Sequence, residues 1–215
     1  MLQPFLPALS ITVCRLMLLL VIGLGLSGCT TVLVESARRI KEDRVADEQF
    51  SDTKISASAM STLMDADKNY LLDVNVDVWE GRLLLTGTVH SASARKEVAQ
   101  AIRADKRVRR VYDELQIVSI EELQRRRDSV KTRSPNRKEG ADRVINDYWI
   151  ETKIAAQLMA AADVSSVNFR WRAVRNVVYV IGRSRSQTEV SAALAIIRAI
   201  EGVVQVKSFV EIKPA

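Results

Sequence analysis

The sequence has few of the side chains on which catalytic sites depend. Among its 215 residues there is one histidine, His90, and there are two cysteines. No histidine is paired with carboxylates at a catalytic or metal-binding spacing, and neither a glycine-rich phosphate loop nor a nucleophile elbow occurs. Asp73 and Asp77 would share one face of a strand, but Asn75 lies between them, and we expect both carboxylates to be solvated. We therefore expect no enzyme, no metal site and no cofactor, and we interpret His90 as a surface residue.

The composition is that of a folded protein, and its charge is unevenly distributed. Hydrophobic residues make up 47% and charged residues 27%, which excludes disorder throughout, and the length allows one or two domains. Residues 46–118 hold 10 basic and 12 acidic side chains, whereas residues 119–141 and 142–215 each carry a net charge of +3. An anionic partner is therefore expected in the middle or the C-terminal half of the chain.

An apolar segment near the N-terminus predicts export. Residues 16–26 are apolar apart from glycines, follow Arg15 and precede the small residues Ser27 and Gly28, which is the layout of a secretory signal too short to span a bilayer comfortably. Residues 26–29 read Leu-Ser-Gly-Cys and resemble the lipobox of bacterial lipoproteins. The alternative is an uncleaved membrane helix, because residues 2–13 are also apolar, but two prolines and Arg15 interrupt that run.

The lipobox resemblance implies a processed and anchored protein. Residues 1–28 would be a signal peptide, and Cys29 would carry a diacylglycerol on its sulfur and an acyl group such as palmitate on its amino group. Two or three acyl chains hold a protein at a membrane stably. Thr30 follows the cysteine in place of the aspartate that often retains lipoproteins at the inner membrane, so the resemblance implies a periplasm-facing protein of the outer membrane. Residues 29–46 are expected to form a solvated tether.

The mature chain contains an internal repeat. Residues 52–55, Asp-Thr-Lys-Ile, are echoed by residues 151–154, Glu-Thr-Lys-Ile, at an offset of 99. From about Leu72 onward the offset is 95, as in the pairs Gly87 with Gly182 and Ile102 with Ile197. We interpret this as two copies of one module of about 70 residues, the second four residues shorter after its first helix.

Each copy predicts the order helix, strand, strand, helix, strand, an α+β fold in which a three-stranded sheet carries two helices. In the first copy we expect a helix over 53–65 capped by Asp52, strands over 72–78 and 83–89 joined by a turn at Glu80-Gly81, and a last strand over 108–118. Asn176 occupies the matching turn in the second copy. The second helix is expected to bury the following apolar residues: Ala94, Val98, Ala101 and Ile102.

These features resemble the BON domain family. The resemblance rests on a glycine near the end of the second strand (Gly87, Gly182) and on the Gly-Val-x-x-Val entry to the third strand at residues 202–206, although Arg107 replaces that glycine in the first copy. With domains at 47–118 and 142–215, the chain is similar to the dual-BON lipoproteins of the Gram-negative outer membrane, the division- and stress-associated lipid-binding group. The resemblance implies phospholipid binding and maintenance of the outer-membrane barrier.

Between the modules, residues 119–141 form a basic linker that includes three consecutive arginines, 125–127. Part of it, over 121–130, could be helical. We favour a solvated connector, with an electrostatic patch for anionic lipid as the alternative.

The helix beginning near Asp147 predicts the lipid-binding site. Residues 150, 154, 158 and 161 form its core face, and a second stripe lies about 145° away. We expect that stripe to bind anionic phospholipid, with the indole at headgroup depth and the ammonium on phosphate. Its candidate residues are Ile145, Tyr148, Trp149, Lys153, Ala156 and Ala160. Alternatively, the stripe packs on the linker or on the first module, where Phe50 matches Trp149 but has acidic neighbours that should repel anionic lipid.

Two functions from different classes therefore remain. One is a lipid-binding accessory protein of the outer membrane. The other is an envelope adaptor that binds a protein or a cell-wall component through the same stripe or through Val190 and Leu194. Nucleic acid is not an expected partner of an exported protein, and the sequence leaves open the lipid species, the oligomeric state and whether the modules dock on each other.

Overall fold

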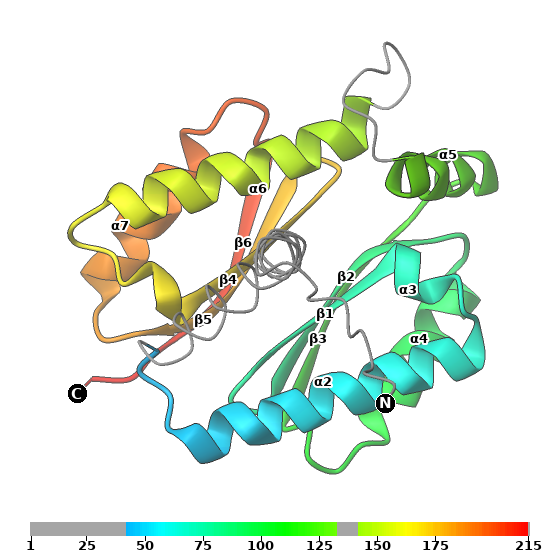
Figure 1. Ribbon diagram of the computed structural model, residues 1–215, viewed down its shortest axis with the longest axis horizontal. Helices are drawn as coiled ribbons and strands as arrows, with labels where there is room; N and C mark the ends of the chain where they lie inside the picture. The colour runs from blue at the N-terminus through cyan, green and yellow to red at the C-terminus, as the bar shows by residue number, and fades with distance from the viewer. Residues whose placement is uncertain (1–41, 133–141, 215) are drawn as a thin grey trace, which may run out of the picture. The chain divides into compact units, whose positions relative to one another are not determined.

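The computed structural model describes residues 42–132 and 142–214, so the expected signal peptide, Cys29 and most of the expected tether lie outside the described residues. The first module consists of α2 (Ala46–Ala66), α3 (Tyr70–Asp73), β1 (Val74–Trp79), β2 (Arg82–Val89), α4 (Ala92–Arg103) and β3 (Arg110–Ile117) (Figure 1). Helix α5 (Ile120–Thr132) follows. The second module consists of α6 (Asp142–Ala160), η1 (Ser166–Asn168), β4 (Phe169–Val174), β5 (Val177–Ser184), α7 (Gln187–Arg198) and β6 (Gln205–Ile212).

Each module has one three-stranded sheet. The orders are β1-β2-β3 and β4-β5-β6, the first pair antiparallel and the second pair parallel in both. A parallel pair needs a long crossover, which α4 and α7 provide. The two-module α+β architecture predicted from the sequence is confirmed.

The helices of each module cover one face of its sheet and enclose a core. Figure 1 shows α2 and α4 on the same side of the first sheet. Helix α2 contributes Ile55 and Leu63 to the core, and α4 contributes Val98 and Ile102. Ala101, which we expected in this core, is half-buried, and Ala99 is buried in its place.

The two copies keep a single offset of 95 along their whole length. Every strand and the helix pair α4 and α7 correspond at this offset, and so do the core residues Ile55 and Ile150. The expected offset of 99 for the first helix, and with it the shorter second copy, is therefore wrong. The two offsets differ by four residues, about one helical turn, so the apolar periodicity survives the shift and misleads a sequence comparison. Trp149 corresponds to Lys54, not to Phe50.

Two expected boundaries also differ. Helix α2 begins at Ala46, so Asp52 lies inside the helix instead of capping it. The strand begins at Val74, because residues 70–73 form the short helix α3.

The hairpin turns are as predicted. Glu80 and Gly81 have φ values of 50° and 72°, and Arg175 and Asn176 have values of 52° and 68°. Two consecutive residues with positive φ give a type I′ turn, whose twist matches that of the flanking strands.

The glycine near the end of each second strand has a steric role. Gly87 has a φ of +124°, and a Cβ there would lie 2.0 Å from the Asp73 carbonyl oxygen. At Gly182 a Cβ would lie 2.2 Å from the Asn168 carbonyl oxygen. The edge strand passes so close that both modules require a glycine.

The two sheets pack on each other through the faces that their helices leave open. The contact contains a third buried apolar cluster, formed by Trp79, Leu84, Val174, Tyr179 and Ile181. The question of docking that the sequence left open is thereby answered, since the modules share one interface.

Candidate functional site

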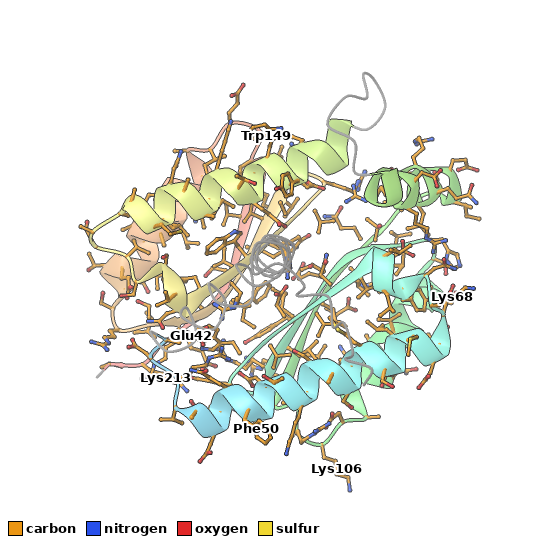
Figure 2. The ribbon with its side chains drawn as sticks, in the orientation of Figure 1. Glu42, Phe50, Lys68, Lys106, Trp149 and Lys213 are labelled. Carbon is orange, nitrogen blue, oxygen red and sulfur yellow. The ribbon has the colours of Figure 1, made fainter. Side chains whose placement is uncertain are left out.

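Helix α6 has one buried face and one exposed apolar face. Ile150, Ile154 and Leu158 are buried in the core of the second module. On the outer side, Tyr148 is 64% exposed and Trp149 is 56% exposed. Figure 2 labels Trp149 on α6. Since a helix packed on a sheet needs only one apolar face, the outer face is not explained by folding.

The structure places most of the predicted site residues on this outer face. Tyr148, Trp149, Ala156 and Ala160 are exposed. The first module and α5 therefore do not cover the indole. Ile145 lies within α6, but its side chain is outside the described part of the chain.

Lys153 is half-buried beside the stripe. Its Nζ lies 3.8 Å from a carboxylate oxygen of Glu201, which is almost fully exposed. An exposed ion pair at this distance contributes about 0–1 kcal/mol, so the ammonium can exchange this partner for another anion at little cost.

Sequence reasoning missed Met159 in the exposed face. Its side chain is 77% exposed and follows Tyr148 by eleven residues, about three helical turns, so both point to the same side. This helical spacing could have identified Met159 from the sequence. We call Tyr148, Trp149, Lys153, Ala156, Met159 and Ala160 the α6 face.

The linker arginines are engaged with the modules. Arg126 binds Asp147 of the second module at 3.1 Å, and Arg127 binds Asp73 of the first module through Nε at 3.0 Å. Glu122, also on α5, pairs with Arg175 at 2.9 Å. Glu122, Arg126 and Arg127 are therefore part of neither a solvated connector nor a patch open to lipid, and residues 133–141 of the linker lie outside the described residues.

Asp73 and Asp77 are buried, with 6% and 8% of their surfaces exposed, so the expectation that both are solvated is wrong. Asp77 pairs with Arg172 at 3.0 Å, as Asp73 does with Arg127. Both arginines come from outside the first module, and a buried carboxylate needs such a partner. His90 is exposed, as predicted.

Residues 42–44, expected in the solvated tether, belong to the fold. Glu42 forms ion pairs with Arg44 and with Arg170 of the second module. Arg44 also binds Asp52 of the first module at 2.5 Å. The segment therefore connects both modules.

Asp43 strengthens this connection. Its backbone N–H donates to the side chain of Asn168 at 2.8 Å, and its carboxylate accepts from Arg185 at 2.7 Å. The hydrogen bond from Arg185 lowers the pKa of Asp43 below its usual range.

The interface between the modules has an approximate twofold symmetry. Asp77 and Arg172 occupy the same position in the two copies, 95 residues apart, and they pair with each other. At the offset of 95, Tyr112 corresponds to Lys207 and Glu114 corresponds to Phe209, so the contacts 112–209 and 114–207 are related by the same symmetry. In the first, the ring of Tyr112 lies 4.5 Å from that of Phe209, and in the second Glu114 binds Lys207 at 2.6 Å. A twofold contact between identical modules would bring a residue on the axis against its own copy and would repeat each off-axis contact twice. Here the on-axis pair is Asp77 with Arg172 and the two off-axis contacts differ, so the copies have diverged to complement each other.

A buried aspartate supports the hairpin turn in each module. Asp52 accepts hydrogen bonds from the N–H groups of Glu80 and Gly81 at 2.7 and 2.8 Å. Asp147 accepts from those of Arg175 and Asn176, both at 2.9 Å. An arginine from the preceding segment neutralises each carboxylate.

A family model of the BON domain matches residues 51–119 and 146–214, with the same offset of 95. The chain belongs to the BON domain family. BON domains suggest phospholipid binding or another membrane-related interaction, the class of function that the α6 face also suits.

This BON-domain protein is also similar to individual proteins. An uncharacterized protein in the gshII 5′ region of Anaplasma centrale is 31% identical over 140 residues, which cover 65% of this chain and 82% of that protein. Among solved structures, CdsD, a structural protein of the type III secretion system of Chlamydia trachomatis, is 13% identical with a TM-score of 0.29 and covers 74% of this chain and 92% of its own. Its C-terminal domain is 14% identical, also with a TM-score of 0.29, and covers 72% and 96%.

Across residues 42–132 and 142–214, no helix is both long and apolar enough to cross a membrane. In the same residues, no group of three or more His, Cys, Asp or Glu side chains is placed to hold a metal ion.

Proposed function

We propose that this BON-domain protein is a lipid-anchored periplasmic protein that binds anionic phospholipid through the α6 face, supports the integrity of the outer membrane and catalyses no reaction. One observation carries the proposal, namely the exposure of Tyr148, Trp149 and Met159 on a helix whose other face is fully buried. An exposed aromatic and apolar face on a helix marks an interaction site.

The chemistry of the α6 face suits the headgroup region. Tyrosine and tryptophan lie at the membrane–water interface because their rings are apolar and their polar atoms remain hydrated. Met159 is apolar and flexible, so it can enter the layer where the lipid acyl chains begin. Lys153, held only weakly by Glu201, is available for a lipid phosphate.

The anchor at Cys29 would make a weak contact sufficient. Residues 30–41 separate that cysteine from the first described residue, a length that reaches about 40 Å when extended. Tethering raises the local concentration of the α6 face at the membrane, so its own affinity need only be modest.

Vesicle sedimentation tests the proposal. The chain from residue 30 onward should bind vesicles more strongly as the phosphatidylglycerol fraction rises and less strongly as salt rises. Trp149→Glu should weaken binding at least about fivefold, since it places a negative charge on the α6 face. Phe50→Glu is the matched control, because Phe50 is an equally exposed aromatic on the first helix of the other module. Equal binding by the two variants would remove the site assignment.

An adaptor that binds an envelope protein is the second candidate. Val190 and Leu194 do not support it, because Val190 is buried and Leu194 packs against the core of the second module. The observation in its favour is the exposure of Phe50, Met60 and Met64 on α2, since methionine adapts to varied partners. A single stoichiometric crosslinked protein, together with no affinity for vesicles, would establish the adaptor and exclude the lipid-binding function.

A further inference from the structure

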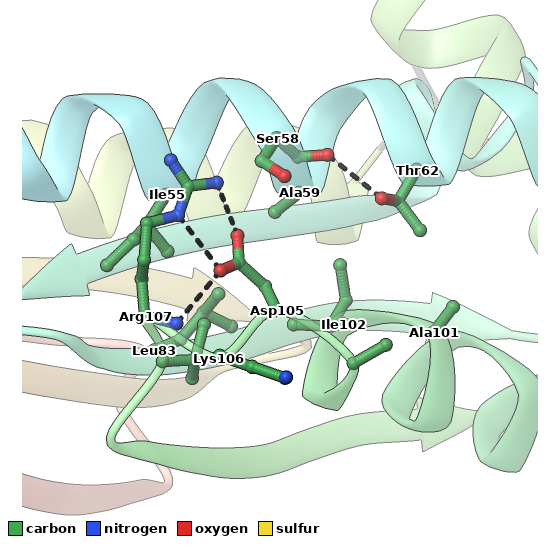
Figure 3. Close-up of a pocket in the computed structure, with 12 residues that line it drawn as sticks. Ile55, Ser58, Ala59, Thr62, Leu83, Ala101, Ile102, Asp105, Lys106 and Arg107 are labelled. Atoms are coloured by element: carbon green, nitrogen blue, oxygen red, sulfur yellow. Dashed lines mark hydrogen bonds and ion pairs between the residues drawn. The ribbon is translucent and has the colours of Figure 1, made fainter.

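A groove opens on the helical side of the first module, between α2 and the end of α4 with the loop that follows it (Figure 3). Its volume is about 470 Å³, within the roughly 300–1,000 Å³ typical of small-molecule sites. The lining is mixed. Its apolar part is formed by Ile55, Ala59, Leu83, Ala101, Ile102 and Val108, and the rest includes the polar or charged residues Ser58, Thr62, Asp105, Lys106 and Arg107. An aliphatic chain matches the apolar part of this lining, and a charged headgroup matches the polar part.

The groove exists because the first module has small or polar residues where the second has large apolar ones. At the offset of 95, Ala59 corresponds to Ile154 and Asp105 corresponds to Ile200, and both isoleucines are buried in the second core. Ala101 corresponds to Ile196, which also packs against that core. The second module thus fills with side chains the space that the first leaves open.

The rim of the groove has a net positive charge. The Arg107 side chain donates to Asp105 from Nε at 2.9 Å and from a terminal nitrogen at 2.6 Å. These bonds lower the pKa of Asp105 to about 2, so the two groups form a neutral pair at ordinary pH. Lys106 lies beside them, exposed, and makes no ion pair with any residue that the structure describes (Figure 3). Glu201 occupies the corresponding position in the second module, so a positive charge at this position is specific to the first module.

We propose that the groove binds a single-chain anionic amphiphile, a fatty acid or a lysophospholipid, with its chain over Ala59 and Ile102 and its carboxylate or phosphate at Lys106. This site lies on a different module from the α6 face and does not depend on it.

The first test is a calorimetric titration of the chain from residue 30 onward with straight-chain fatty acids and lysophosphatidylglycerol below their micelle concentrations. Each added methylene should raise affinity about three- to fourfold until the groove is full. Binding of only the fatty acids, or of only the lysophospholipid, identifies which of the two amphiphiles the groove accepts. No binding by either overturns the proposal.

The decisive variants transplant residues from the second module. Ala59→Ile should weaken decanoate binding at least about tenfold, because the added carbons occupy the space of several methylenes. Ala101→Ile fills the groove from the opposite wall and gives the same result if Ala59→Ile does not fold. Undiminished binding in a folded variant of either kind excludes the groove.

The charge requirement has its own control. Lys106→Glu should weaken decanoate binding about fivefold and leave decanol binding unchanged, whereas Lys68→Glu, at another exposed lysine of the first module, should change neither. Equal effects of the two lysine variants would overturn the role of Lys106. Trp149→Glu should leave decanoate binding intact, so failure of the vesicle experiment and failure of this one are distinguishable.

Discussion

The two modules share a scaffold and differ at their surfaces. Both have a buried aspartate under a type I′ turn and a glycine near the end of the second strand. They differ at positions where the shared fold does not require a particular residue. Lys54 of the first module corresponds to Trp149 on the first helix of the second, and Ala59 beside the groove corresponds to Ile154. The two copies thus keep one fold and present different side chains at their outer surfaces.

The modules also differ where they meet. A contact of Asp77 with a second Asp77, or of Arg172 with a second Arg172, would place like charges together in a partly buried interface. In this protein Asp77 of the first module pairs with Arg172 of the second, so neither of these like-charge contacts forms. Substitutions that make the modules more alike should therefore weaken the interface, and substitutions in the shared scaffold should harm either module equally.

The largest effect is expected from the shared glycines. Gly87→Ala and Gly182→Ala should each destabilise the protein by about 3 kcal/mol or more, since the new Cβ would overlap a backbone oxygen at 2.0 or 2.2 Å. Urea unfolding followed by circular dichroism measures the loss. Gly81→Ala is a milder comparison, because its Cβ would meet side-chain carbons of Arg109 at 3.1 Å. A loss in only one module would show that the edge strands are not equivalent.

The buried turn aspartates should come next. Asp52→Asn should cost about 3 kcal/mol, because it breaks an ion pair with Arg44 and disturbs two turn hydrogen bonds. Asp147→Asn should cost less, since the Arg126 side chain is 16% exposed and that of Arg44 only 6%. Chemical unfolding of both variants checks the order, and the reverse order would show that exposure of the arginine is not what distinguishes the modules.

The charge pair on the approximate twofold axis should have a moderate effect that can be reversed. Asp77→Arg and Arg172→Asp should each destabilise the protein by about 1–2 kcal/mol, because each places like charges together. The double variant exchanges the charges and should recover most of the loss in a double-mutant cycle. Additive losses would mean that the two side chains do not interact.

The smallest effect should be a pH dependence that belongs to the second module alone. Burial raises the pKa of Glu151, whereas the first module has Ser56 at this position. A carboxyl group with a raised folded pKa stabilises the protein below its unfolded pKa, near 4.5, and this contribution is lost as pH rises through the folded value. Urea midpoints of the unaltered chain should therefore fall relative to those of Glu151→Gln between pH 4.5 and neutrality. Parallel pH profiles would contradict the raised pKa.

Local patterns in the sequence determined the element order, the turns and the existence of a repeat, although not the offset of its first helix. Alternating apolar residues, turn residues with positive φ and recurrent glycines act within a few residues of each other, so they can be recognised without the fold. The exposure of Tyr148 and Trp149 was predictable for the same reason, because helical periodicity separates them from the core face of α6.

Only the tertiary structure decided which charges are buried and what they bind. Asp77 meets Arg172 from 95 residues away, and Glu42 meets Arg170 from 128 residues away. A local sequence pattern predicts that such residues are solvated, because no residue nearby in the sequence neutralises them. A carboxylate is buried only when folding brings a cation to it. The groove beside Ala59 and the packing of the two sheets likewise depend on facing elements, because the shape of a surface is set by side chains that become neighbours only in the fold.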